Sequence, residues 1–323
     1  MTPANPRRRR SNTKTGCGMP RKTPKPGPGQ ILVRHQAVGV NFIDTYQRSG
    51  LYPMKLPAGL GSEAAGVVEA VGDGVSRFEV GDLAAYAGTP GAYADANAVR
   101  ADRAVKVPAG IDARTASAAL LKGMTVEFLI RRLHRVEPGE TILVHAAAGG
   151  VGQILVQWAK ALGAVVIATV GSEEKAARVR QLGADHVILY RQQDVAAEVR
   201  RITDGKGVPV AYDSVGKDTF EGTLGSLARR GLFVSFGNAS GPPPPVEARR
   251  LMIGGSLFFT RPTMGDYQAT TEELDASAAA LFAGIGSGQV KIEIGQTFPL
   301  AEARKAHEAL ESRATIGASL LFP

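Results

Sequence analysis

The stretch "LVHAAAGGVGQ", residues 143–153, decides how the rest of the chain is interpreted. Apolar residues that suit a strand lead into a turn of alanine and glycine, and a helical pattern follows. Ala147, Gly149 and Gly152 occupy the three glycine positions of G-x-G-x-x-G, with alanine at the first. Such a turn can serve packing alone, or its backbone N–H groups can approach a phosphate at the helix N-terminus.

The sequence around this turn favours phosphate binding. The turn follows a predicted strand at 140–146 and precedes a predicted helix at 152–163, and a second predicted strand covers 164–170. In that context the pattern is typical of dinucleotide binding, with the pyrophosphate near Gly150 and Val151. The sequence therefore predicts a dinucleotide-binding unit here.

The same alternation of short apolar strands and amphipathic helices continues toward residue 262. Alternation of this kind predicts a parallel sheet with right-handed crossovers. Further helices are predicted at 172–183, 194–205 and 218–231, and further strands at 186–190, 208–215, 232–237 and 254–262.

The segments before and after this unit differ from it in composition and in the spacing of their apolar residues. Residues 30–110 are rich in glycine and proline and predict a β-rich domain, with strands from Gln30 and around 65–71 and 82–87. Additional helices are predicted at 113–134, 270–288 and 300–312, before a final strand at 317–323.

Composition and charge narrow the class of protein. The chain has 323 residues, of which 44% are hydrophobic, and no apolar run approaches the roughly 20 residues that cross a bilayer. The sequence therefore predicts a soluble protein with no membrane partner. Its only cysteine, Cys17, fits a reducing cytoplasm, which is the predicted location.

The net charge of +8 belongs to one end of the chain. Residues 1–25 hold eight of the 38 lysines and arginines and no acidic residue, so the remainder has 30 basic against 30 acidic residues. A disordered basic tail is the favoured interpretation, and a nucleic-acid-binding arm is the alternative. The neutral remainder argues against a nucleic acid partner.

The residues after the second strand bear on the identity of the dinucleotide. An NAD site usually has a carboxylate there, whereas this chain has Gly171 and Ser172, with Lys175 one helical turn later. These residues would leave room, a hydroxyl donor and a positive charge for a 2′-phosphate. The alternative is that Glu173 or Glu174 bonds the 2′-OH of NAD. The sequence favours NADPH.

Seven motifs together resemble one family. In chain order they are "VGVNFIDTYQRSGLYP", "LGSEAAGVVEAVG", "LLKGMTV", "HAAAGGVG", "YDSVG", "SFGNASG" and "ESRATIG". They closely resemble the zinc-independent quinone oxidoreductases, the zeta-crystallin-like branch of the medium-chain dehydrogenase/reductases, and above all the bacterial NADPH:quinone oxidoreductases. The resemblance extends from about residue 24 to the end.

The resemblance implies a fold and an assembly. The fold is an α/β architecture in which a doubly wound parallel Rossmann sheet, residues 119–261, is inserted into a β-rich GroES-like catalytic domain, residues 26–118 and 262–323. It also implies a homodimer, formed through the Rossmann edge strand near "GSLFFTRP". An apolar strand left bare at a sheet edge would promote aggregation, which is compatible with such pairing.

Residues 1–23 depart from the family pattern. The family begins with a strand-forming segment that has no counterpart here, so the catalytic domain is expected to lack one or two strands. A transit peptide, a misassigned start or an altered reading frame are the alternative explanations.

The resemblance also bears on metal binding. Zinc alcohol dehydrogenases of this superfamily have a catalytic cysteine where Asn41 stands and a metal-binding histidine where Ser62 stands, and "LLKG" offers no third ligand. Without thiolate or imidazole ligands, no zinc site is predicted. A quinone suits such a site, because its reduction yields a phenolate-like oxyanion with a pKa near 10, as for tyrosine.

The resemblance implies a set of site residues. For four of them a structural role is the alternative: Tyr52 and Phe259 could pack, Asp44 could cap a helix, and Arg313 could be a surface cation. The predicted catalytic residues are Asn41, Tyr46, Tyr52 and Thr125. The predicted cofactor-binding residues are Asn41, Asp44, Tyr46, Thr125, Gly149, Gly150, Val151, Gly152, Gly171, Ser172, Lys175, Tyr190, Ser214, Phe236, Gly237, Asn238, Ser240, Phe259, Arg261 and Arg313.

Three functions are compatible with these observations. NADPH-dependent reduction of a quinone is the leading hypothesis. The same loop and cofactor would serve reduction of the double bond of an enone or enoyl thioester. The third is a non-catalytic NADPH-binding protein with a structural or RNA-binding role, which the basic tail permits and the neutral body argues against.

Overall fold

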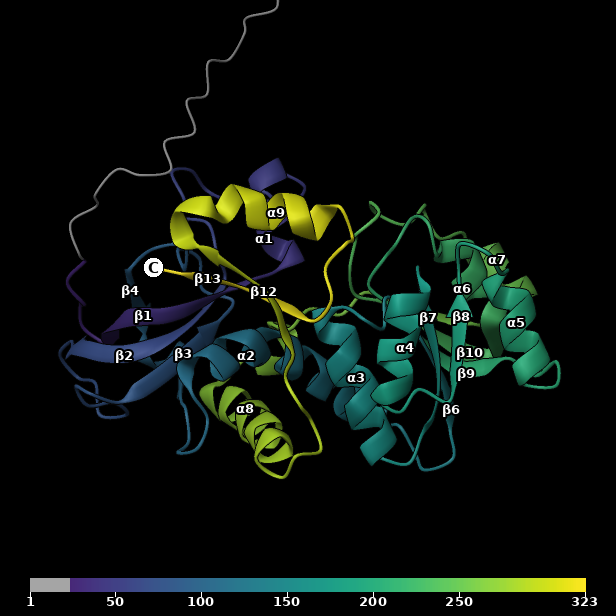
Figure 1. The fold of residues 1–323 in the computed structure, drawn as a ribbon, viewed down its shortest axis with the longest axis horizontal. Helices are drawn as coiled ribbons and strands as arrows, with labels where there is room; N and C mark the ends of the chain where they lie inside the picture. Colours follow the sequence, from purple (N-terminus) through teal and green to yellow (C-terminus); the bar gives the residue numbers. More distant parts are fainter. Residues whose placement is uncertain (1–23) are drawn as a thin grey trace, which may run out of the picture.

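The structure, a computed structural model, describes residues 24–323 (Figure 1). The predicted basic tail therefore lies outside the described residues, apart from Pro24 and Lys25. The expectation that the catalytic domain lacks strands before residue 24 concerns the same segment and stays a prediction. The described chain builds two sheets, which lie at opposite ends of the molecule in Figure 1.

The first sheet combines the amino-terminal and carboxyl-terminal parts of the chain. Its strands follow the order β12-β13-β1-β2-β3-β5, and β4 pairs with β1. Except for β12 and β13, neighbouring strands are antiparallel, as the predicted β-rich domain requires. The strands are β1 (Gln30–Val40), β2 (Glu63–Val71), β3 (Leu83–Ala87), β4 (Ala96–Arg100), β5 (Ala104–Lys106), β12 (Ile294–Pro299) and β13 (Ala318–Phe322).

The second sheet is parallel throughout and doubly wound, which confirms the predicted fold class. Its strand order is β11-β10-β9-β6-β7-β8, so the direction of winding reverses between β6 and β9. In open sheets of this kind, ligands bind where the strand order reverses, at the carboxyl ends of the strands. The strands are β6 (Thr141–Val144), β7 (Val165–Val170), β8 (His186–Leu189), β9 (Val208–Asp213), β10 (Leu227–Ser235) and β11 (Phe258–Thr260).

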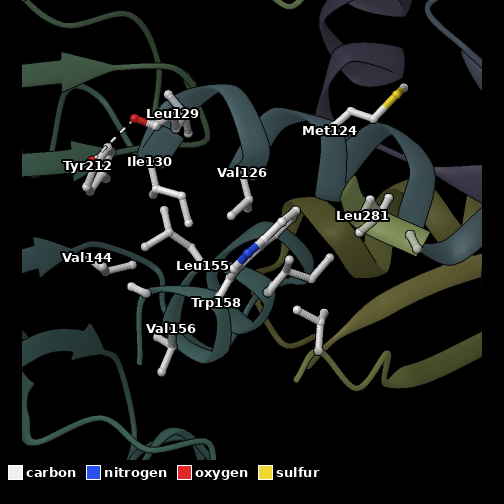
Figure 2. Close-up of a cluster of buried hydrophobic side chains, with 14 of the residues drawn as sticks. Met124, Val126, Leu129, Ile130, Val144, Leu155, Val156, Trp158, Tyr212 and Leu281 are labelled. Carbon is white, nitrogen blue, oxygen red and sulfur yellow. Dashed lines mark hydrogen bonds between the residues drawn. The ribbon is translucent and has the colours of Figure 1, made fainter. Parts of the chain in front are cut away.

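Helix α2 joins the two halves. It follows the first five strands, continues into a π-helical turn at Leu129–Leu133, and packs against α3, α8 and the first sheet. Figure 2 shows its side chains meeting Trp158 and Leu155 of α3 in one buried cluster. The helices are α1 (Phe42–Ser49), α2 (Ala113–Phe128), α3 (Gly150–Ala161), α4 (Glu173–Gln181), α5 (Val195–Ile202), α6 (Phe220–Ser226), α7 (Ala248–Ile253), α8 (Thr271–Gly286) and α9 (Ala303–Glu311).

The predicted helix at 218–231 is wrong in its second half. Helix α6 ends at Ser226, and β10 begins at Leu227, whose side chain is buried and pairs with Val208 of β9. The pairing register of β10 with β9 then shifts between Leu227 and Leu232, where the backbone of Arg230 has a left-handed conformation with a φ of 62°. Burial of Leu227 against the sheet outweighed the local helical pattern, as tertiary context often does.

The predicted strand at 254–262 is also too long, since β11 covers only its three residues Phe258–Thr260. The domain bounds stay a prediction. No helix in residues 24–323 is long and apolar enough to cross a bilayer.

Candidate active site

The glycine turn lies between β6 and α3, at the point where the strand order reverses. A side chain at Gly152 would not fit, because its Cβ would lie 2.4 Å from the carbonyl oxygen of Ala146 and 2.6 Å from Cα of Ala147. Glycine therefore permits the close approach of α3 to the end of β6. This is the geometry that the sequence motif predicts.

The first turn of α3 has backbone donors without a partner inside the helix. The first N–H groups of a helix have no partner within it, and here they belong to Gly150, Val151 and Gly152. Within the described chain, no side chain caps this helix at Gly149. N–H groups without an intrahelical partner and the positive end of the helix dipole suit a pyrophosphate, so the residues present fit a dinucleotide.

Polar and cationic side chains gather at the end of β7. Tyr190 lies over Gly171, whose Cβ, if present, would fall 2.7 Å from the Tyr190 hydroxyl oxygen. Ser172 caps α4 by accepting a hydrogen bond from the backbone N–H of Lys175. Lys175 is half-buried; burial lowers the pKa of its ammonium group, and the nearby charge of Arg191 lowers it further.

Arg191 is a residue that the sequence analysis missed. Its Nε atom lies 3.4 Å from the position that a Cβ on Gly171 would occupy, so its guanidinium faces the same space as Tyr190 and Lys175. The signal was present in the sequence, because Arg191 directly follows the tyrosine that ends the third predicted strand. Glu173, one of the two residues named in the NAD alternative, is exposed and lies 3.8 Å from Arg180.

The segment between α9 and β13 crosses to the second sheet. Lys175 Nζ donates to the carbonyl oxygen of Arg313 at 2.7 Å, and Arg313 Nη1 donates to Asp218 Oδ2 at 3.0 Å. At the other end of the segment, Gly317 N donates to the carbonyl oxygen of Ala148 in the glycine turn. The structure thus brings Arg313 to the same edge as the glycine turn and Lys175.

Two tyrosines of the first domain contact the second. Tyr46 Oη accepts a hydrogen bond from the backbone N–H of Asn238 at 2.8 Å. Tyr52 Oη accepts from Asn238 Nδ2 at 3.2 Å and from Arg261 Nη2 at 2.8 Å, and the two rings lie 5.3 Å apart. Burial raises the pKa of Tyr46 to about 12, so this hydroxyl stays protonated. The structure brings these four predicted residues together.

The loop that follows β9 and the loop that follows β10 pack closely against each other. A Cβ on Gly237 would lie 2.2 Å from the carbonyl oxygen of Ser214, which explains the glycine. Ser240 Oγ donates to the carbonyl oxygen of Val215, and Phe236 packs against the buried core. The structure thus brings four predicted residues, Ser214, Phe236, Gly237 and Ser240, together beside Asn238.

Two other predicted residues have structural contacts. The ring of Phe259 lies 5.0 Å from that of Phe233 and 6.4 Å from that of Phe220, in the core beside the second sheet. Thr125 Oγ1 donates to the carbonyl oxygen of Leu121 within α2. These contacts agree with the structural alternative for Phe259, and the cofactor contacts of both residues stay predictions.

Asn41 belongs to a buried network that the sequence analysis did not find. Its Nδ2 donates to Glu63 Oε2 at 2.8 Å, and Lys122 Nζ donates to the same oxygen at 2.9 Å. Glu63 Oε1 accepts from the backbone N–H of Leu121. Glu63 is completely buried and Lys122 is 4% exposed. A lone lysine in the apolar stretch "ALLKGM" was the available signal.

Asp44 caps α1 and is completely buried. It accepts hydrogen bonds from the backbone N–H of Asn41 (2.9 Å), from Ser62 Oγ (2.9 Å) and from Tyr93 Oη (3.0 Å). Burial raises the pKa of Asp44 to about 6, against the opposing effect of these donors. The side chain has the capping role that was the structural alternative.

Tyr93 connects Asp44 to a buried histidine. Tyr93 Oη lies 2.8 Å from His307 Nε2, and Arg48 Nη1 lies 3.0 Å from His307 Nδ1. A guanidinium can only donate, so His307 Nδ1 accepts and Nε2–H donates to Tyr93. Burial lowers the pKa of His307 to about 4, and the charge of Arg48 acts in the same direction.

These two groups predict opposite pH dependences. Asp44 binds its proton more tightly in the folded state, so its contribution to the free energy of unfolding falls as pH rises from about 4 to 6. His307 binds its proton less tightly when folded, so its contribution rises from about pH 4 to 6.5. In urea unfolding across this range, we expect Asp44→Asn to leave a rising profile and His307→Gln a falling one.

Each change in pKa corresponds to about 3 kcal/mol, so the two profiles are expected to diverge by roughly 3–6 kcal/mol over this range. The exposed His186→Gln variant serves as a control and should follow the wild-type profile. Parallel profiles for Asp44→Asn and His307→Gln would contradict the assignment.

The metal positions of the zinc enzymes have other residues here. Asn41 and Ser62 are both buried and hydrogen-bonded to carboxylates. Among residues 24–323, no three histidine, cysteine, aspartate or glutamate side chains cluster closely enough to hold a metal ion.

Known proteins share both the sequence and the fold. Residues 27–109 match the alcohol dehydrogenase GroES-like domain, and residues 150–279 match the zinc-binding dehydrogenase family. A quinone oxidoreductase of Pseudomonas aeruginosa is 54% identical over 93% of each chain. A 2-haloacrylate reductase of a Burkholderia species is 44% identical over 94% of this chain and 93% of its own.

Solved structures agree with these relatives. The quinone oxidoreductase of Escherichia coli, solved in complex with NADPH, superimposes with a TM-score of 0.93 at 48% identity, over 94% of this chain and 95% of its own. These similarities confirm the resemblance on which the site residues were predicted. The chain belongs to the zeta-crystallin-like quinone oxidoreductases, an enzyme family within the medium-chain dehydrogenase/reductases.

Proposed function

We propose that this protein is an NADPH:quinone reductase that works without zinc. The observation that carries the proposal is the open N-terminus of α3 at the reversal of strand order, with the cations of Lys175, Arg191 and Arg313 at the same edge. The similarity to an Escherichia coli quinone oxidoreductase that was solved with NADPH supports the choice of cofactor.

The residues present fit NADPH in three places. Backbone N–H groups of Gly150 and Val151 would hold the pyrophosphate. Lys175 and Arg191, with Ser172 and Tyr190 beside them, would hold the 2′-phosphate. Asp44, which caps α1, would support the loop of Asn41 from beneath. The remaining predicted residues would line the groove between these two ends and the nicotinamide; they are Asn41, Tyr46, Thr125, Gly149, Gly152, Gly171, Ser214, Phe236, Gly237, Asn238, Ser240, Phe259, Arg261 and Arg313.

Bound NADPH would supply a hydride from the nicotinamide. The protein's part would be to hold the acceptor oxygen and exclude competing water. Tyr46 and Tyr52 suit this role, because their hydroxyl oxygens accept N–H donors and, in the described chain, neither hydroxyl hydrogen has an acceptor. With a pKa near 12, Tyr46 would be a hydrogen-bond donor and not a proton source. Asn41 and Thr125 complete the proposed catalytic set.

Reduction of an activated carbon–carbon double bond is the second candidate. The specific support is the 2-haloacrylate reductase at 44% identity, a protein of the same fold whose substrate has such a bond. The same cofactor groove would serve both reactions, so the choice of acceptor distinguishes them.

A homodimer and a cytoplasmic location complete the proposal. Strand β11 is the last strand of the second sheet, and Phe258 on it is 60% exposed. Met252 and Ile253 of α7 are each 65% exposed nearby in the chain. Pairing of two β11 edges would cover an apolar strand that is otherwise bare. The single cysteine of the sequence supports a reducing compartment.

The function is tested by following NADPH oxidation with a panel of quinones, enones, aldehydes and 2-haloacrylates, with NADH in parallel. We expect turnover with at least one quinone and a preference for NADPH. Tight NADPH binding without turnover of any quinone would defeat the enzyme proposal. Turnover with alkenes alone would favour the second candidate.

Replacing Lys175 by alanine is expected to raise the KM for NADPH about tenfold and to leave the KM for NADH nearly unchanged, since a charge-assisted hydrogen bond contributes on the order of 1.5 kcal/mol or more. Only the 2′-phosphate distinguishes the two nucleotides. The exposed Lys206→Ala variant is the control for loss of one positive charge. Equal losses with both nucleotides would show that Lys175 does not contact the 2′-phosphate.

A further inference from the structure

Lys122 is a buried cation with incomplete hydrogen bonding. Its side chain is 6% exposed, and its Nζ donates to Glu63 Oε2 at 2.9 Å. An ammonium group has three N–H donors, yet within residues 24–323 it makes this single hydrogen bond. Buried polar groups are normally paired, so two unmatched donors in the interior need an explanation.

The end of this side chain lies against the first residue of α3. A Cβ placed on Gly150 would fall 2.9 Å from Cδ and 3.1 Å from Cε of Lys122. The ammonium group is one bond further along the chain. It therefore lies near Gly150, the first residue of α3, at the positive end of the helix dipole.

A cation beside the positive end of a helix is unfavourable unless a negative charge is near. Glu63 neutralises Lys122, but its oxygens also accept hydrogen bonds from Asn41 Nδ2 and the backbone N–H of Leu121. The first turn of α3 contains no acidic residue to compensate the partial positive charge of the helix end. This arrangement is suited to an anion that binds at the glycine turn.

We propose that Lys122 is a positioning residue for the coenzyme. Its ammonium group, held by Glu63 beneath Gly150, adds positive charge at the pyrophosphate position, and through Glu63 the same ion pair orients the amide of Asn41. This role rests on the proposed function, namely that a nicotinamide dinucleotide binds at the glycine turn. A role in coenzyme binding accounts for a charged residue in the apolar part of α2, where Lys122 contacts Glu63 of the first sheet and Gly150 of α3.

The test separates this role from simple structural pairing. Lys122→Met keeps the stem that fills the space under Gly150 and removes the charge. Because this change leaves Glu63 buried without its counter-ion, the double variant Lys122→Met/Glu63→Gln is needed, since it removes both buried charges. Dissociation constants for NADPH and NADH are measured by fluorescence titration, and stability by urea unfolding.

We expect the double variant to regain most of any stability lost in Lys122→Met, while both variants bind NADPH and NADH about tenfold more weakly than the wild type. The losses should be equal for the two nucleotides, because both have a pyrophosphate. Lys160→Met/Asp185→Asn removes a comparable pair at the other end of α3, and it should bind within twofold of the wild type.

A double variant that binds both nucleotides as tightly as the wild type would overturn the proposal and leave Lys122 with a structural role. A loss restricted to NADPH would also overturn it, because the effect would then lie at the 2′-phosphate. Wild-type protein that binds neither nucleotide would instead defeat the proposed function, and this role with it.

Discussion

Replacing Gly152 by valine is expected to abolish nucleotide binding and to lower the free energy of unfolding by about 3 kcal/mol or more. The Cβ alone would lie 2.4 Å from the carbonyl oxygen of Ala146 and 2.6 Å from Cα of Ala147. Both are backbone atoms, so no side-chain rotation can relieve the contact. Helix α3 would have to move away from the turn, and its first N–H groups would move with it.

Urea unfolding and fluorescence titration with NADPH would measure the two effects. Gly286→Ala is the matched control, since Gly286 ends helix α8 and a Cβ there would meet no atom within 4 Å. We expect that control to be neutral or stabilised by up to about 1 kcal/mol, because alanine favours helix. A Gly152→Val protein with wild-type stability and binding would refute the packing argument.

Replacing Asp213 by asparagine is expected to destabilise the protein by about 3 kcal/mol. Asp213 is completely buried at the end of β9 and accepts four hydrogen bonds. The donors are the backbone N–H groups of Val215 and Gly216, at 2.7 and 3.0 Å, and the hydroxyls of Thr219 and Thr223, at 2.6 and 3.0 Å. The single oxygen of an amide can keep the two backbone N–H donors, but its NH2 group then faces the two threonine hydroxyls. These must turn to the carbonyl oxygens of Gly216 and Thr219, and the charge-assisted hydrogen bonds of the carboxylate are lost.

The same change is expected to weaken NADPH binding, because Asp213 holds the loop that contains Ser214 and leads to Asp218. Stability and affinity would again be measured by urea unfolding and titration. Asp194→Asn is the control: Asp194 caps α5 through the N–H of Ala197, and asparagine is an equally good helix cap. Equal stabilities of the two variants would contradict the role given to Asp213.

Much of the fold was predictable from local pattern. The alternation of apolar strands and amphipathic helices between 140 and 215 predicted a parallel sheet, because a sheet covered by helices on both faces needs continuous apolar strands. The helix at 218–231 failed in its second half because the helical pattern there competes with burial of Leu227 beside Val208. Periodicity does not report which neighbour a residue will meet.

Less of the candidate site than of the fold could be predicted from local sequence pattern. The glycine turn, Ser172 and Lys175 follow from a motif and its spacing, whereas most of the groove residues came from family resemblance. Arg191 was missed although it adjoins Tyr190 in the sequence. Glu63 and Lys122 were missed although each lies in a motif of the family, because the two motifs are far apart in the sequence and nothing in them shows that these side chains meet. The sequence cannot show that they share an oxygen-to-nitrogen contact of 2.9 Å.

The amino-acid sequence by itself determined the class of fold, the place of the phosphate-binding turn and the absence of zinc ligands at Asn41 and Ser62. These depend on residue types and short spacings, which act locally. Only the tertiary structure decided which charged groups are buried together. Glu63, Lys122 and Gly150 come from three separate segments, and packing of β2, α2 and α3 brings them into contact. Burial then determines how much each charge stabilises or destabilises the fold, because a charge removed from water depends on neighbouring charges and hydrogen bonds to replace its hydration.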